Sequence, residues 1–258
     1  RFDKILSINE CHINDPIFND LNTAIKACAN KFNLVPYDVR KHVGFLRFLV
    51  LRIGVHTNEV MVNFVTAGYK PKLIAPLVEL ILEKFPNVKS IVNTINADKN
   101  NTATGNIKLI HGESYINEKI GDYIFKVSAN SFFQTNSYQV KTLYDYIIKT
   151  AKFKKNDIVY DLYCGTGTIG IYISSYVKKV YGVEIVEDAI EDAKSGHYDY
   201  CIIDQCEDES WHTSDEEKNY HKEGSYFNNF QAIGDYPGER DLLQPFYADS
   251  QNYFPAIP

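Results

Sequence analysis

The spacing of apolar residues predicts a helix and then a hairpin in the first quarter of the chain. Apolar positions recur at helical spacing over residues 16–31, and Asp15 stands before a proline as a capping residue. Residues 45–53 and 59–66 are rich in β-branched and aromatic residues, and a short polar segment separates them. This pattern is typical of two strands joined by a turn.

Residues 71–110 continue this mixture of helix and strand. Residues 71–85 have helical periodicity and are followed by Pro86, whereas residues 88–95 and 106–110 have strand-like composition. A polar loop over residues 97–105 separates these two strands. Because helices and strands do not alternate strictly up to about residue 127, the pattern favours an α+β layer.

The pattern changes after Ser128 to a strict alternation. We expect a helix over 138–151, a strand over 158–163, a helix over 168–177, a strand over 180–184 and a helix over 187–193. This alternation is typical of a doubly wound parallel sheet. From residue 195 no apolar period persists, and only a weak strand at 200–204 is predicted.

The sequence therefore predicts an α/β protein in three parts. An α+β central domain spans residues 1–127, and the first half of a Rossmann-like domain spans 128–194. A tail of irregular structure spans 195–258 and does not continue either pattern.

Composition and charge narrow the classes of protein. Hydrophobic residues make up 45% of the chain and charged residues 23%, which is the balance of a soluble globular protein. No apolar run approaches the roughly 20 residues that span a bilayer, so we expect a cytoplasmic protein without membrane contact. Residues 197–258 hold 13 acidic and 3 basic groups, which leaves the preceding part with a net charge of +4. That charge permits contact with phosphate but does not require it.

The five cysteines are scattered and are expected to be reduced thiols. Cys201 and Cys206 are close enough in sequence to suggest a metal pair, but a zinc site needs four ligands. We therefore predict no metal site.

A glycine-rich turn is the first candidate for chemistry. The segment Asp161-Leu-Tyr-Cys-Gly-Thr-Gly-Thr168 follows an apolar strand and begins a helix, where Gly165 and Gly167 allow close approach of a ligand. Glu184 ends the next strand, where an acid can accept hydrogen bonds from a ribose. Together they predict an adenosine site. The alternative interpretation is a structural turn and a helix-capping acid.

A second segment makes the pattern specific. Ser131-Phe-Phe-Gln-Thr-Asn136 precedes the turn, and Tyr181-Gly-Val-Glu-Ile185 follows it. With Gly44-Phe-Leu-Arg47 and Arg52-Ile-Gly upstream, these segments resemble the RNA uracil-5 methyltransferase family, which acts on 23S ribosomal RNA or transfer RNA. The resemblance covers about residues 1–194.

The resemblance implies S-adenosyl-L-methionine as cofactor and a central domain that contacts RNA. It implies cofactor contacts from Gln134, Tyr163, Gly165, Thr168 and Glu184, with Asp161 bracing the turn. Alternative interpretations are that Tyr163 is a core residue and that Gln134 caps a strand. Cys164, inside the turn, is interpreted as a small packed thiol.

The family's reaction needs two further groups. A cysteine thiolate adds to carbon 6 of uracil and activates carbon 5, and a carboxylate later removes the carbon-5 proton. We find no match to the family's segments for these groups after Glu184, and neither Cys201 nor Cys206 has the nucleophile's sequence context. No catalytic residue is therefore assigned, and the chain is interpreted as truncated at both ends with a foreign or frame-shifted tail.

The leading hypothesis is a monomeric RNA uracil-5 methyltransferase that acts on 23S ribosomal RNA and whose isolated fragment is inactive. The first alternative is a catalytically inactive protein that binds S-adenosylmethionine or RNA. A weaker one is methylation of another acceptor, because the cofactor fold serves many substrates.

Overall fold

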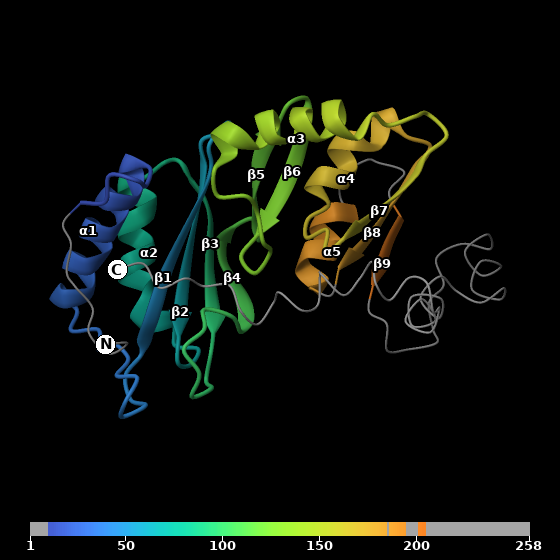
Figure 1. The fold of residues 1–258 in the computed structure, drawn as a ribbon. Helices are drawn as coiled ribbons and strands as arrows, with labels where there is room; N and C mark the ends of the chain where they lie inside the picture. Colours follow the sequence, from blue (N-terminus) through green and yellow to red (C-terminus); the bar gives the residue numbers. More distant parts are fainter. Residues whose placement is uncertain (1–9, 185, 195–200, 205–258) are drawn as a thin grey trace, which may run out of the picture. The chain divides into compact units, whose positions relative to one another are not determined.

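The computed structural model describes residues 10–184, 186–194 and 201–204. Two sheets, a hairpin and their helices make up this part of the chain (Figure 1). In chain order the elements are α1 (Pro16–Lys31), β1 (Leu46–Gly54), β2 (Glu59–Thr66), α2 (Pro71–Lys84), β3 (Val88–Ile95), β4 (Asn106–Gly112), β5 (Tyr115–Ile120), β6 (Tyr123–Ser128), α3 (Ser137–Ala151), β7 (Ile158–Leu162), α4 (Thr168–Ile173), η1 (Ser174–Tyr176), β8 (Lys179–Glu184), α5 (Glu187–Lys194) and β9 (Cys201–Asp204).

The first sheet has the strand order β1-β2-β3-β4. Strands β1 and β2 form the predicted antiparallel hairpin, with Gly54 opposite Glu59 at its closed end. Strands β2 and β3 are parallel, so the chain crosses over between them through α2. The predicted helix α1 begins after Asp15, whose carboxylate accepts a hydrogen bond from the Ile17 amide at 3.1 Å.

Strand β2 is buried on both faces. Val60, Val62 and Phe64 pack against α1 and α2 on one face. Met61 points to the opposite face, because side chains alternate along a strand, and there it packs in a cluster with Ile116 of β5. The centre of this sheet is therefore covered by helices on one side and by another β-element on the other.

That covering element is the β5–β6 hairpin, which the sequence pattern did not predict. Its strands pair antiparallel from Tyr115 opposite Ser128 to Ile120 opposite Tyr123. One end of the hairpin packs on the first sheet through Ile116. The other end packs against α3 and α4 through Ile120. The hairpin thus links the first sheet to helices α3 and α4 through apolar contacts.

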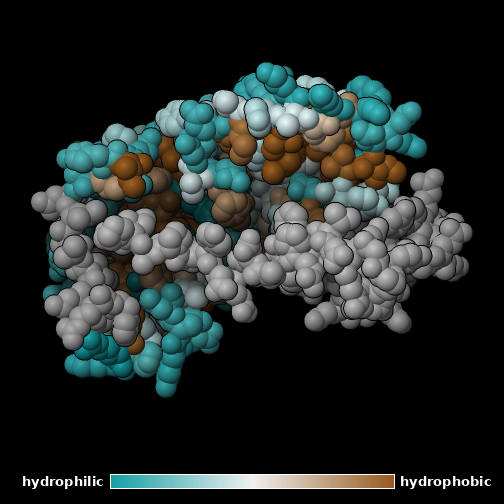
Figure 2. All heavy atoms as spheres, in the orientation of Figure 1, coloured by the Kyte–Doolittle hydropathy of each residue, from teal (hydrophilic) through white to brown (hydrophobic). Residues whose placement is uncertain are grey.

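The second sheet has the order β7-β8-β9, and β7 and β8 are parallel as expected. The fold class predicted from the sequence is confirmed. Helix α3 buries Val140 and Tyr144, and Figure 2 shows hydrophilic residues along its outer side with hydrophobic residues below them, toward α4. The predicted helix over 168–177 is shorter: α4 ends at Ile173, and a 3₁₀ turn, η1, follows.

Three predictions depend on which residues the structure describes. Among the described residues, no helix is long and apolar enough to cross a bilayer. Cys201 begins β9, whereas Cys206 and the acidic segment 205–258 lie outside the described part. The boundary between residues 1–127 and 128–194 stays a prediction, and it falls at the end of β6.

Candidate cofactor site

The glycine-rich turn follows β7 directly and has a backbone that few residues adopt. Tyr163, Gly165 and Gly167 all have positive φ angles, of 60°, 57° and 71°. Glycine adopts this conformation without penalty, but a bulky residue such as tyrosine pays a strain of about 1–3 kcal/mol. Such strain is concentrated at functional sites, so the conformation of Tyr163 itself points to this turn.

The turn and the tip of β8 are joined by a direct hydrogen bond. The Gly165 amide donates to Glu184 Oε2 at 2.8 Å, and the Val186 amide donates to Oε1 at 2.9 Å. The Cys164 amide also donates to the carbonyl of Val183 at 3.0 Å. Because β7 and β8 are parallel, their carboxyl ends lie at the same edge of the sheet. The structure therefore brings together two of the predicted cofactor residues, Gly165 and Glu184.

Thr168 begins α4 and faces the interior. Its hydroxyl is 2.7 Å from the hydroxyl of Tyr144 on α3, and both residues are buried. Burial raises the pKa of Tyr144, so this phenol stays protonated at neutral pH. Asp161 Oδ2 accepts the Gly170 amide at 2.9 Å, so this carboxylate braces the first turn of α4.

The segment over residues 128–136 lies against the turn. The carbonyl oxygen of Phe132 is 3.8 Å from the position that a Cβ on Gly165 would take, and apart from Gly165 and its two chain neighbours no other described atom lies within 4 Å of that position. Gln134, two residues further on, is partly buried. Its contact with the cofactor stays a prediction, as do those of Tyr163, Gly165, Thr168 and Glu184.

The exposed fractions of Tyr163 and Cys164 test how each side chain was interpreted from the sequence. The Tyr163 side chain is 91% exposed, so its interpretation as a core residue is wrong. Cys164 is buried, which agrees with a small packed thiol. The two neighbours thus point in opposite directions, and Tyr163 is the one available to a ligand.

Sequence reasoning missed two acidic residues of α5. Asp192 accepts hydrogen bonds from the Ser128 amide at 2.8 Å and from the hydroxyls of Ser128 and Ser131 at 2.6 and 2.7 Å. Asp188 accepts one from Asn130 Nδ2 at 2.9 Å. Asp188 and Asp192 are four residues apart, which places both on one face of the helix, and this spacing could be read from the sequence.

Burial dominates the electrostatics around this contact. It raises the pKa of Asp192, and the hydrogen bonds from Ser128 and Ser131 oppose that rise. Burial lowers the pKa of Arg52 on β1, while the charge of Asp192 acts in the opposite direction. Arg52 donates from Nη2 to the carbonyl of Ala129 at 3.0 Å. The Ser128–Ser131 strip is therefore held by helix α5 and by β1 of the first sheet.

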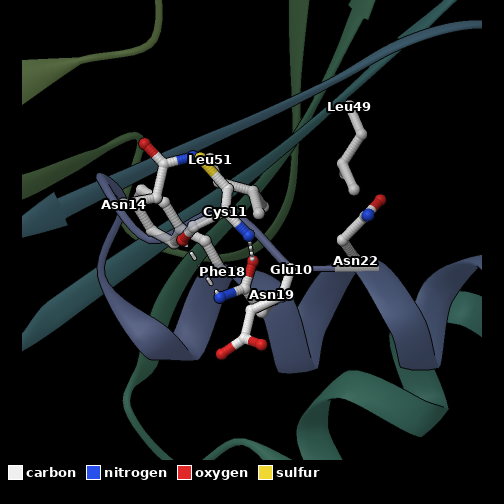
Figure 3. A pocket seen from close by; sticks show the side chains of 8 residues that line it. All are labelled: Glu10, Cys11, Asn14, Phe18, Asn19, Asn22, Leu49 and Leu51. Carbon is white, nitrogen blue, oxygen red and sulfur yellow. Dashed lines mark hydrogen bonds between the residues drawn. The ribbon is translucent and has the colours of Figure 1, made fainter. Parts of the chain in front are cut away.

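A separate hollow of about 310 Å³ lies between α1 and β1 (Figure 3). Leu49 and Leu51 of β1 and Asn22 of α1 contribute to its lining, and the side-chain amide of Asn19 exchanges two hydrogen bonds with the backbone of Cys11. None of the predicted cofactor residues lines this hollow. It is distinct from the site at the glycine-rich turn.

Comparison with known proteins adds to this geometry. Residues 89–205 match the family model described as tRNA (Uracil-5-)-methyltransferase. An uncharacterized RNA methyltransferase of Oceanobacillus iheyensis is 41% identical over 185 residues, which is 71% of this chain and 40% of that protein. Another, of Chlorobaculum tepidum, is 39% identical over 75% of this chain and 41% of that protein.

Among solved structures, the tRNA (uracil-54, C5)-methyltransferase of Pyrococcus abyssi, in complex with S-adenosyl-L-homocysteine, is similar to this chain. The TM-score is 0.69 at 31% identity, over 80% of this chain and 50% of that one. The chain thus spans half the length of this structure, and about two fifths of the length of the two curated relatives. These matches confirm the predicted resemblance to the RNA uracil-5 methyltransferase family.

Proposed function

We propose that this chain supplies the cofactor half of an S-adenosylmethionine-dependent RNA uracil-5 methyltransferase. The observation that carries the proposal is the Gly165–Glu184 hydrogen bond, which joins the turn after the first parallel strand to the acid at the end of the next. This edge of a parallel sheet is where nucleotide-type ligands bind in doubly wound folds. The Pyrococcus abyssi protein, which holds S-adenosyl-L-homocysteine, supports the choice of ligand.

The residues at this edge fit an adenosyl ligand. A Cβ on Gly165 would meet only the Phe132 carbonyl among described atoms, so there is room above the turn for a ligand. The ring of Tyr163, in the same turn, is exposed and can offer an apolar face to a ligand. Glu184 is fixed at the strand tip by two backbone amides, and a carboxylate there suits the two hydroxyls of a ribose.

Each predicted residue has a defined part in this proposal. Glu184 accepts from the ribose, Tyr163 packs on the cofactor, and Gly165 lets it approach the backbone. Gln134 supplies an amide from the neighbouring segment. Thr168 acts from the start of α4, where its hydroxyl is shared with Tyr144.

The bound cofactor supplies a methyl group on a sulfonium centre, and carbon 5 of an RNA uridine is the acceptor in this proposal. The sequence resemblance favours 23S ribosomal RNA, whereas the Pyrococcus abyssi relative is named for uracil 54 of transfer RNA. Both RNAs are therefore substrates to test. We assign the nucleophile and the base to no residue of this chain, and expect the 258-residue chain to bind cofactor without transferring methyl groups.

Two measurements test the proposal. Calorimetric titration of the 258-residue chain with S-adenosyl-L-homocysteine should show one site, and Glu184→Gln should weaken binding about tenfold, the equivalent of roughly 1.4 kcal/mol. Glu191→Gln, which removes the same charge from an exposed position on α5, should leave the affinity unchanged. Absence of binding by the wild-type chain would contradict the proposal.

The second measurement concerns the reaction. A methyl-transfer assay on 23S ribosomal RNA fragments and on transfer RNA should be negative for this chain. It should be positive for a chimeric chain that carries a complete family C-terminus. If both chains bind the cofactor but neither transfers methyl groups, the binding-protein alternative is favoured.

A further inference from the structure

We propose that Asp192 is a positioning residue for the cofactor site, which it shapes by fixing the segment that carries Gln134. This inference rests on the proposed function and assigns a role to a residue that none of the sequence motifs includes. It starts from a buried carboxylate that accepts three hydrogen bonds from one short strip of chain.

The side chain of Asp192 accepts several short hydrogen bonds. Asp192 is only 8% exposed, and its two oxygens accept the amide and the hydroxyl of Ser128 and the hydroxyl of Ser131 within 2.6–2.8 Å. Short bonds of this kind to a charged acceptor are about twice as strong as neutral ones. Ser131 is completely buried, so its hydroxyl depends on this acceptor.

The strip is held at two more points. Asp188, one turn earlier on α5, accepts from Asn130, and Arg52 of β1 donates to the Ala129 carbonyl from the first sheet. Four consecutive residues, 128–131, are therefore fastened through backbone or side chain. Such a strip has little freedom to shift along either neighbour.

The fastened strip leads directly into the proposed site. Ser131 is followed by Phe132, whose carbonyl faces Gly165, and then by Gln134. At the other end of the contact, α5 begins three residues after Glu184. Asp192 thus ties the amide segment to the helix that follows the ribose-binding acid. Because binding groups must be placed within about an ångström, loss of this tie should displace Gln134 relative to Glu184.

Replacing Asp192 with asparagine tests the hydrogen bonds separately from the volume of the side chain. It has nearly the shape of aspartate but no charge, so the bonds to its carbonyl oxygen lose their charge assistance, and the Ser128 hydroxyl must turn to accept from its NH₂ group. A change confined to these hydrogen bonds should therefore weaken the hold on the strip without opening a cavity.

The test is a double-mutant cycle read by calorimetric titration of the full chain with S-adenosyl-L-homocysteine. We expect Asp192→Asn alone and Gln134→Ala alone each to weaken binding about tenfold. In the Gln134→Ala background, Asp192→Asn should cost less than about threefold, because two changes that act through the same cofactor contact are non-additive. Glu191→Gln, on the same helix with the same charge change, is the control and should have no effect.

Several outcomes would overturn the inference. Unchanged affinity in Asp192→Asn would do so, as would a full tenfold loss that adds to that of Gln134→Ala. If Asp192→Asn fails to fold, Ser131→Ala removes one bond and should still weaken binding about threefold, and no loss there rejects the role. Absence of binding by the wild-type chain contradicts the proposed function instead, so the two failures are distinguishable.

Discussion

The two sheets of this protein differ in how completely they are covered. In the first sheet, β2 is buried along nearly its whole length, between α1 and α2 on one face and the β5–β6 hairpin on the other. In the second sheet, Ile158, Tyr160 and Leu162 of β7 all remain substantially exposed among the described residues. The centre of the first sheet is therefore closed on both faces, whereas in the part of the chain that the structure describes β7 is open.

The polar groups of the two sheets also differ in which groups they bond. In the first sheet, the buried Asn93 bonds inside the sheet, to the Phe64 carbonyl and the Thr66 hydroxyl. In the second sheet, the half-buried Asp161 and Glu184 lie toward the carboxyl ends of β7 and β8, where they accept the amides of Gly170 and Gly165 around a strained turn. A rigid scaffold beside a strained, open edge is the arrangement expected of a binding site.

The largest expected effect comes from removing one large apolar side chain from each sheet and comparing the losses of stability. Phe64→Ala removes a fully buried ring from β2 and should lower the free energy of unfolding by about 4 kcal/mol. Leu162→Ala on β7 removes a side chain that is already 46% exposed, so it should cost less than about 1 kcal/mol. Urea denaturation followed by circular dichroism measures both, and equal losses would contradict the contrast.

The next effect concerns Glu118, a buried carboxylate on β5 that secures the β1–β2 turn. It accepts hydrogen bonds from the amides of Val55, His56 and Lys119 at 2.7–3.0 Å. Glu118→Ala leaves these donors without their acceptor and should cost about 3 kcal/mol in urea unfolding. The exposed Glu113→Ala is the control, and a loss below about 1 kcal/mol in Glu118→Ala would show that the carboxylate is dispensable.

A smaller effect is expected where α3 meets α4. Tyr144→Phe removes the hydroxyl that bonds Thr168 in the interior and should destabilise the chain by about 1 kcal/mol. Tyr146→Phe on the same helix changes a side chain that is 64% exposed and should be neutral. Thermal unfolding of the two variants compares them directly, and equal midpoints would argue against the Tyr144–Thr168 bond.

The smallest effect is a dependence of stability on pH at Asp192. Burial raises the pKa of this carboxyl above its ordinary value of 3.8, so the folded chain binds the proton more tightly than the unfolded chain. Its contribution to stability is therefore greatest below 3.8 and decreases as the pH rises through the folded-state pKa. Relative to Asp192→Asn, the wild type should lose stability across this window, and a constant difference in unfolding free energy would contradict the raised pKa.

Much of this architecture was predictable from the sequence, because long periodic segments dominate it. The helix from Pro16 to Lys31 has helical periodicity and a capping Asp15, and the strand pair at 46–66 is rich in β-branched and aromatic residues. The β5–β6 hairpin was missed because its strands are six residues long and carry charged side chains, such as Glu118, on the buried face. Helix α4 was predicted too long, since the apolar pattern continues through η1.

The candidate site was also only partly predictable from the sequence. The glycine turn and Glu184 were found because strand, turn and acid follow one another at a regular spacing along the chain. The role of Asp192 depends on a contact with residues 61–64 positions earlier, which no local pattern encodes. The strain at Tyr163 was likewise invisible, because the sequence does not show its φ angle.

The most direct test of the central claim is a crystal structure of the chain with S-adenosyl-L-homocysteine. The account predicts the ribose hydroxyls at Glu184, the ligand above Gly165, and both Gln134 and Tyr163 in contact with it. A ligand bound elsewhere, for example in the hollow between α1 and β1, or a complex in which Gln134 and Tyr163 point away from it, would contradict the account.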